Sequence, residues 1–172
     1  MTNTIEDIIN RRSIRKYSSK QILKEELDSV LLAGTCAPSG HNRQSSIIIA
    51  VQNKEDISLM SKLNSELRGI NTDPYYGAPT VLVVLSDATS VFAVQDGSLV
   101  MGNLMNAAYS IGLGSCWINR TKEVFELPEG KELLKKWGII GDYIGIASCI
   151  LGYPLETPKI KKRKEKYIYF VP

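Results

Sequence analysis

The 172-residue sequence is poor in the residues from which metal centres and disulfide frameworks are built. It has three cysteines (Cys36, Cys116 and Cys149) and one histidine, His41. No two cysteines form a CxxC pair, so the usual metal-ligand spacings cannot be assembled. An odd number of cysteines without a signal peptide favours reduced thiols. We therefore expect a cytoplasmic protein without a metal site.

Long apolar runs are also missing. No run approaches the roughly 20 residues that a membrane-spanning helix needs, so no membrane partner is expected. The net charge of +3 is too small to indicate nucleic-acid binding by itself, and the positive excess is concentrated in residues 11–16 and 159–166. A basic protein whose two clusters contact nucleic acid is the alternative from another functional class.

Several motifs of enzyme chemistry are absent as well. The phosphate-loop pattern GxxxxGK[ST] does not occur, and Gly112-Leu113-Gly114 is followed by Trp117 where a dinucleotide fingerprint needs its third glycine. No carboxylate pair lies in an apolar setting, and Cys36 and His41 are a weak nucleophile–base candidate, five residues apart in a loop. We predict no catalytic side chain, as in an enzyme whose cofactor carries the chemistry.

One short stretch is difficult to explain as structure alone. Arg11-Arg12-Ser13-Ile14-Arg15 places three guanidinium groups and a hydroxyl within five residues, and no acid lies between Asp7 and Glu25. Arginine forks match phosphate oxygens two at a time, and serine adds another donor. The stretch indicates an anion site, with a basic surface turn as the alternative.

Apolar periodicity predicts one domain of helices and strands. We expect helices at about 4–10, 25–34, after Asn53, at 90–111 and at 129–137, and strands at 47–51, 80–85, 115–119 and 143–153. The continuous apolar run of 47–51 is typical of a strand buried on both faces. Loose alternation of the two element types favours an α+β or α/β class with one central sheet.

The predicted helix at 90–111 is apolar over most of its circumference, which is typical of a core or an interface. Its glycines, among them Gly97 and Gly102, each cost up to about 1 kcal/mol of helix propensity, so close backbone approach is the expected compensation. We expect this small-residue face, Gly97 included, to pack on a partner subunit.

Five motifs in order resemble the FMN-dependent nitroreductase family. They are Arg-Arg-Ser-x-Arg near the start, Ala-Pro-Ser-x-x-Asn-Arg-Gln about 25 residues later, Tyr-Gly-Ala-Pro before a strand, Gly-Leu-Gly-Ser-Cys-Trp-Ile after the small-residue helix, and a late Gly-Tyr-Pro followed by Pro-Lys-x-Lys-x-Arg. Each motif is modest alone, but the set spans residues 5–169.

The resemblance implies an α+β fold with a mixed or antiparallel central sheet flanked by helices. It also implies an intertwined homodimer with FMN at the subunit interface, and residues 1–172 as a single flavin-binding domain. The expected activity is ping-pong electron transfer from NAD(P)H to a small acceptor such as a nitroaromatic or quinone. A specialised flavin enzyme of the same fold, a reductive dehalogenase or a flavin-cleaving enzyme, is the alternative within the enzyme class.

The resemblance also implies cofactor-binding roles for particular residues. Those at the flavin phosphate and ribityl chain are Arg11, Arg12, Ser13 and Arg15, joined by Lys161 and Arg163 of the basic segment 158–172. Those along the ring are Pro38, Ser39, Gly40 and Asn42 from the partner subunit, Asn71 at the pyrimidine edge, and Ile118 and Asn119, whose backbone N–H groups face N5 and O4.

The sequence departs from the family pattern at three places. Ser45-Ser46 stands where Pro-Trp is usual, Asn119-Arg120 stands where an acidic or small residue and glycine are usual, and Pro74 replaces a basic residue. These departures concern the substrate side more than the phosphate side.

Overall fold

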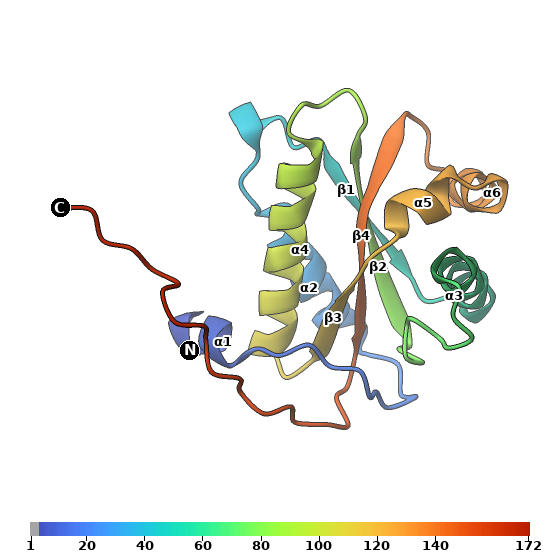
Figure 1. Cartoon of the computed structure of the whole chain (residues 1–172). Helices are drawn as coiled ribbons and strands as arrows, with labels where there is room; N and C mark the ends of the chain where they lie inside the picture. Colours follow the sequence, from blue (N-terminus) through green and yellow to red (C-terminus); the bar gives the residue numbers. More distant parts are fainter. Residues whose placement is uncertain (1–3) are drawn as a thin grey trace.

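A computed structural model describes residues 4–172 and shows a β-sheet between two layers of helices (Figure 1). Over this range the sheet has four strands: β1 (Ser46–Val51), β2 (Thr80–Asp87), β3 (Gly114–Ile118) and β4 (Tyr143–Gly152). Their order is β1-β2-β4-β3, and every neighbouring pair is antiparallel. The predicted α+β class is confirmed, and β1 and β3 are the two edge strands.

Helices cover both faces of the sheet. One face carries α2 (Lys24–Thr35) and α4 (Ala93–Ser110), and the other carries α3 (Lys54–Arg68), α5 (Thr121–Glu126) and α6 (Pro128–Lys136), while α1 (Thr4–Asn10) precedes the first extended segment. Along β2, Leu82 and Val84 pack toward α4, and Val83 and Leu85 pack toward α3 and α5. Because successive side chains of a strand point to opposite faces, β2 contributes to the apolar core on each side of the sheet.

The structure adds a helix that the sequence analysis missed. Helix α5 has six residues, too few to show a helical apolar repeat, and it starts directly after Arg120 in the left-handed region (φ 74°). It ends at Leu127, which also caps α6, where Pro128 occupies the first turn. Six residues give no pattern long enough to recognise, whereas α6 agrees with the helix predicted at 129–137.

One expectation about burial and one about helix packing were wrong. Strand β1 is half-buried over most of its length and not buried on both faces, because it lies at a sheet edge, whereas β2 is buried almost throughout. A Cβ added to Gly97 would lie 2.6 Å from Ile146 Cγ1 and 2.9 Å from Ser86 Oγ. Gly97 therefore brings α4 close to its own sheet and does not face a partner.

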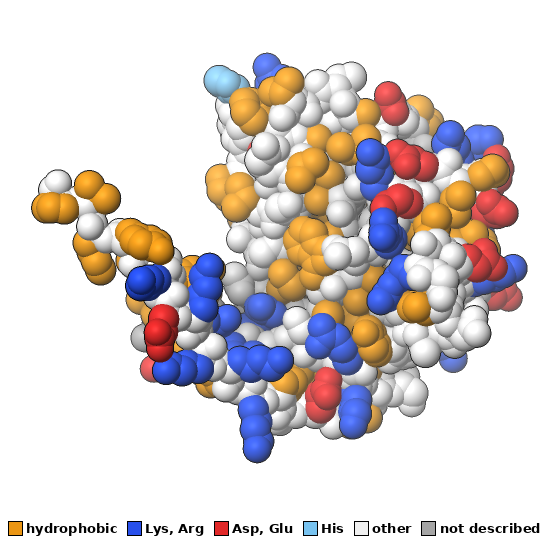
Figure 2. All heavy atoms as spheres, viewed as in Figure 1, with side chains coloured by type: hydrophobic (Ala, Val, Ile, Leu, Met, Phe, Trp, Pro, Cys, Tyr) orange, Lys and Arg blue, Asp and Glu red, His pale blue; other side chains and the backbone are white. Residues whose placement is uncertain are grey.

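The outward face of α4 lies elsewhere on the helix. Apart from its own helix backbone and chain neighbours, a Cβ added to Gly102 would meet no atom of residues 4–172 within 4 Å, and the side chains of Val94 and Leu99 are exposed. Figure 2 shows apolar side chains in the region of α4 and at the far end of the C-terminal segment. The helix is thus packed on one side and open on the other.

No helix between Thr4 and Pro172 combines the length and apolar character needed to cross a membrane. Within the same residues, the histidine, cysteine and acidic side chains form no group of three that could hold a metal ion.

A buried carboxylate joins α3 to α6. Asp56 is 5% exposed and accepts hydrogen bonds from Lys136 Nζ (2.6 Å) and Trp137 Nε1 (2.9 Å). Burial tends to raise the pKa of Asp56, but these hydrogen bonds and the charge of Lys136 outweigh it, so the pKa lies below its usual value. The folded state therefore favours the ionised form of this group.

We predict that Asp56→Asn lowers the free energy of unfolding at pH 7 by about 1–3 kcal/mol. Because the folded pKa is depressed, the wild-type contribution is present above about pH 4, the ordinary aspartate value, and is lost as the pH falls below it. Denaturant unfolding from pH 7 to pH 2 should show a shallower decline for the variant. Asp142→Asn, at an exposed carboxylate, is the control, and equal pH slopes for wild type and Asp56→Asn would contradict the assignment.

Candidate functional site

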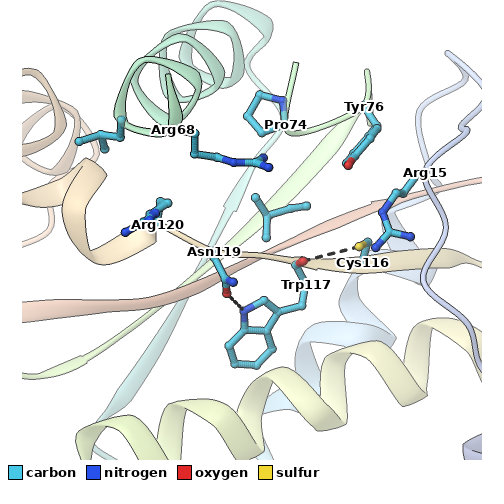
Figure 3. Close-up of a pocket in the computed structure, with 10 residues that line it drawn as sticks. Arg15, Arg68, Pro74, Tyr76, Cys116, Trp117, Asn119 and Arg120 are labelled. Carbon is cyan, nitrogen blue, oxygen red and sulfur yellow. Dashed lines mark hydrogen bonds between the residues drawn. The ribbon is translucent and has the colours of Figure 1, made fainter. Parts of the chain in front are cut away.

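A pocket of about 430 Å³ lies beside the outer edge of β3, and we call it the edge pocket. Figure 3 shows its walls, which come from the segment after α1, the end of α3, the loop before β2, and β3 with the turn that follows. Its lining residues are Arg15, Leu67, Arg68, Pro74, Tyr76, Cys116, Trp117, Ile118, Asn119 and Arg120.

The segment 11–15 runs alongside the start of β3. The Ile14 N–H donates to the Ser115 carbonyl oxygen (3.0 Å), and Ser13 pairs with Ser115 as an isolated parallel bridge. Ile14 is buried, and a Cβ added to Gly114 would lie 2.9 Å from its side chain. In an extended chain, alternate side chains point to opposite sides. Ser13 and Arg15 therefore share one side of the extended chain, and Ile14 lies on the other. Arg11 still belongs to the last turn of α1, because its N–H donates to the Asp7 carbonyl oxygen (2.8 Å).

The three arginines of this segment have different surroundings. Arg12 Nη1 donates to the carbonyl oxygens of Ile9 (2.7 Å) and Arg11 (2.6 Å), so it satisfies the end of α1. The guanidinium carbon of Arg15 lies 5.9 Å from the centre of the Tyr76 ring, at the edge pocket. The predicted cluster is therefore divided, and Arg12 is separate from the other two.

Among the three arginines, Arg11 has a buried donor without a partner; Asn64 Oδ1 and Tyr75 Oη are also buried and unpartnered among residues 4–172. The Arg11 Nη1 is buried and has no hydrogen-bond partner among residues 4–172, and the same is true of the Ser115 Oγ. A buried cationic donor without an acceptor costs more free energy than an ordinary lost hydrogen bond. Burial raises the pKa of Cys149 to about 12, and the positive charge of Arg11 acts against that rise. Arg11 is thus a cation beneath the sheet edge that is suited to an anionic ligand.

The turn after β3 is held by side chains on both sides of the sheet. Trp117 Nε1 donates to Asn119 Oδ1 (2.6 Å), and the buried Asn64 donates from Nδ2 to the Asn119 carbonyl oxygen (2.7 Å). Because the Ser115 carbonyl faces the outer edge, the backbone groups of Trp117 face the same edge. Ile118 and Asn119 lie at the pocket, at the end of a firmly positioned strand.

The loop 38–42 lies at the other end of α4. Gly40 N–H donates to Asp96 Oδ1 (2.9 Å), and Ser45 Oγ donates to Asp96 Oδ2 (3.3 Å), with Asp96 only 4% exposed in the first turn of α4. Pro38 and Ser39 line a second cavity of about 430 Å³ that shares no lining residue with the edge pocket. Within one chain this loop, including Asn42, is therefore not part of the edge pocket.

The remaining predicted residues lie on the surface of the chain. Asn71 is exposed in the loop after α3 and is not among the lining residues of the edge pocket. Lys161 and Arg163 are exposed in the C-terminal segment, which runs away from the sheet (Figure 1). Their cofactor-binding roles stay predictions.

Sequence reasoning did not assign Arg68, Tyr76, Trp117 or Arg120 to the site, although the structure places all four at the edge pocket. Arg68 ends a helix, where a cation is commonly explained by the helix dipole, so nothing marked it. Three of the four stood in stretches that the sequence analysis had marked: Tyr76 in Tyr-Gly-Ala-Pro, Trp117 in Gly-Leu-Gly-Ser-Cys-Trp-Ile, and Arg120 in a departure from the family pattern.

The thiols and the histidine offer no nucleophile–base pair. Cys36 is exposed at the end of α2, and His41 packs its ring 5.8 Å from that of Phe92; no hydrogen bond joins Cys36 to His41 in the described part of the chain. Cys116 is buried, and its Sγ donates to the Trp117 carbonyl oxygen (3.5 Å). The site can bind and orient charged, flat molecules, with its donors supplied mainly by guanidinium and backbone groups.

Comparison with known proteins gave consistent matches. Residues 8–153 match the sequence profile of the Nitroreductase family. The chain is 31% identical over 165 residues to a Methanothermobacter thermautotrophicus protein that carries the provisional name NADH dehydrogenase/NAD(P)H nitroreductase, covering 91% of this chain and 80% of that protein. It is 27% identical over 183 residues to the FMN reductase (NADPH) of Bacillus subtilis, covering 96% and 72%.

A solved structure is similar over the full length. The crystal structure of a Bacteroides fragilis nitroreductase with bound FMN superposes with a TM-score of 0.91 at 29% identity, and the match covers 100% of both chains.

Proposed function

The chain belongs to the Nitroreductase family, and on that premise we propose that it is an FMN-dependent oxidoreductase that transfers electrons from NAD(P)H to a small acceptor such as a nitroaromatic or quinone. Its relatives include FMN reductases of Bacillus subtilis and an NADPH-flavin oxidoreductase of Vibrio harveyi. The observation that carries the proposal is the buried, unpartnered Nη1 donor of Arg11, four residues before Arg15, which lines the edge pocket.

The residues present fit FMN. A flavin mononucleotide has a phosphate at one end and a flat ring at the other, so it needs an anion site joined to a pocket. Arg11 and Ser13 supply the anion site, and the edge pocket of about 430 Å³ lies within the ordinary range of ligand pockets. Arg15, Ile118 and Asn119 would line the ring, and the predicted Asn71, Lys161 and Arg163 would close on the cofactor from the loop after α3 and from the C-terminal segment. Arg12, occupied by α1 carbonyls, would contribute least.

FMN, when bound, accepts a hydride from NAD(P)H and passes the electrons on, so the protein needs no nucleophile. The residues of the chain would bind the cofactor and orient it. Arg15 and the outward backbone N–H groups at the end of β3 are donors that would stabilise negative charge on a bound ring. Asn64 and Trp117 hold that strand end in place.

We further propose an intertwined homodimer, which would bring the loop 38–42 of the partner subunit over the edge pocket. Three features support it. The loop is remote from the pocket of its own chain, the outward face of α4 exposes Val94 and Leu99, and the C-terminal segment ends in the exposed residues Tyr167–Val171. Figure 1 shows that segment extending away from the body of the chain, as an arm that could lie on a second subunit.

The proposed activity predicts ping-pong kinetics, because donor and acceptor must use the same pocket in turn. Double-reciprocal plots of NAD(P)H oxidation at several quinone concentrations should be parallel. Cys36→Ser and His41→Ala should keep flavin reduction within about tenfold of wild type, since losing a true general base costs 10²–10⁴-fold. Loss of activity in His41→Ala with FMN still bound would refute a cofactor-only mechanism.

A second prediction contrasts two neighbouring arginines. Arg11→Ala should weaken FMN binding by about tenfold to a hundredfold, because it removes a charge-assisted contact worth about 1.5–3 kcal/mol. Arg12→Ala should retain FMN, because its guanidinium is committed to the end of α1. Flavin fluorescence titration of the apoprotein measures both, with riboflavin as the ligand that lacks phosphate. Equal losses in the two variants, or equal affinity of wild type for FMN and riboflavin, would contradict the assignment.

A third prediction concerns assembly. Leu99→Glu places a charge on the outward face of α4 and should convert the dimer to monomer in sedimentation velocity, with loss of bound FMN. Ile140→Glu is the matched control, because Ile140 is 91% exposed in the loop between α6 and β4, and this change should leave the dimer intact. A wild-type monomer that binds FMN stoichiometrically would overturn the proposal.

A further inference from the structure

Three arginines surround the edge pocket, and the fit to FMN uses only one of them. Figure 3 shows Arg15 beside Tyr76 on one side, and Arg68 and Arg120 on the other side, from the end of α3 and the start of α5. Among the described residues that line this pocket, none is acidic. Like charges facing one space repel each other, and an anion bound between them would relieve that repulsion.

Arg68 is the freest of the three cations. It is exposed at the last position of α3, just before Gly69 in the left-handed region (φ 63°), and no ion pair or hydrogen bond joins it to a carboxylate within residues 4–172. Its guanidinium group extends over the pocket in Figure 3. Its five donors are therefore available to a ligand.

Arg120 is held in place by a neighbour. Its Nη1 donates to Glu123 Oε1 (2.6 Å), and this hydrogen bond contributes most to the lowered pKa of Glu123. The pair takes one of the donors of Arg120 and leaves the others. The other nearby acid, Glu156, accepts a hydrogen bond from the backbone N–H of Arg15 and lies outside the pocket lining.

We propose that the edge pocket selects reactants that carry a carboxylate or phosphate group, which Arg68 and Arg120 bind on the side opposite Arg15. This inference rests on the proposed function, because it concerns what binds over the cofactor. The anion of FMN itself is assigned to Arg11 and Ser13 on a different segment, so Arg68 and Arg120 serve a second anionic group. That group is either a carboxylate or phosphate of the acceptor or the additional 2′-phosphate that distinguishes NADPH from NADH.

The test compares matched reactants in the two half-reactions of the FMN-loaded protein. The acceptor arm follows flavin reoxidation by 4-nitrobenzoate and by its neutral methyl ester, and the donor arm follows flavin reduction by NADPH and by NADH. The variants are Arg68→Ala, Arg120→Ala and Arg68→Lys. Lys122→Ala, a change at an exposed cation of α5 that does not line the pocket, is the control.

We expect wild type to react faster with 4-nitrobenzoate than with its ester, or with NADPH than with NADH. That preference should fall about tenfold in each alanine variant, as expected for one partly solvated charge-assisted contact, and should persist in Arg68→Lys and Lys122→Ala. It should also shrink as salt is raised. The arm in which the change occurs identifies the anion as belonging to the acceptor or to the donor.

A binding measurement separates this inference from the proposed function. Titration calorimetry of 4-nitrobenzoate against its ester, with wild type and Arg68→Ala, reports anion recognition without turnover. A protein that holds no flavin but binds the anion through Arg68 would refute the function and support the anion site. Unchanged preferences in both arms and in calorimetry, or loss of FMN from the Arg68 and Arg120 variants, would overturn the inference while the function stands.

Discussion

The free outer edge of β3 is the constraint on which the site depends. The strand order places β3 at the end of the sheet, and the segment 11–15 pairs with it only at Ser115. Beyond that bridge, within residues 4–172, no further strand adds to the edge, so the Trp117 N–H has no strand partner there. An edge left open in this way is normally a liability, and a ligand bound there, as proposed, would give a reason for keeping it open.

The residues of segment 11–15 have two different roles, one in folding and one in binding an anion. Arg12 and Ile14 are used for folding, because Ile14 is buried against Gly114 and Arg12 satisfies the carbonyls of α1. Arg11, at the end of α1, and Arg15, on the opposite side from Ile14, form no ion pair within residues 4–172 and can face an anionic ligand. A buried guanidinium nitrogen without an acceptor, as at Arg11 Nη1, is tolerable only where the rest of the structure is stable enough to hold it, and the two apolar clusters on either side of the sheet provide that stability.

Much of the architecture could be predicted from the sequence, because long apolar repeats determine long elements. The helices at 25–34 and after Asn53, and the strands at 80–85 and 143–153, are confirmed within two or three residues. Helix α5 was too short for periodicity, and the burial of β1 depends on strand order, which periodicity does not contain. The direction faced by Gly97, and the approach of Arg68 and Arg120 to one pocket, likewise arise from three-dimensional packing between segments distant in sequence.

The loop 38–42 does not cover the edge pocket of its own chain, so the pocket would need a second chain to enclose a bound ring. Asp96 anchors this loop at one end of α4, whereas the edge pocket lies at the free edge of the sheet, and their lining residues do not overlap. A flat ring bound at the edge pocket would therefore keep one side exposed unless a second chain covered it. If the cover comes from a partner, the chain itself supplies the charged walls, and Arg68 and Arg120 then bind the reactant without taking part in holding the cofactor. Cofactor retention and reactant choice could thus change independently, since they depend on different arginines on opposite sides of one pocket.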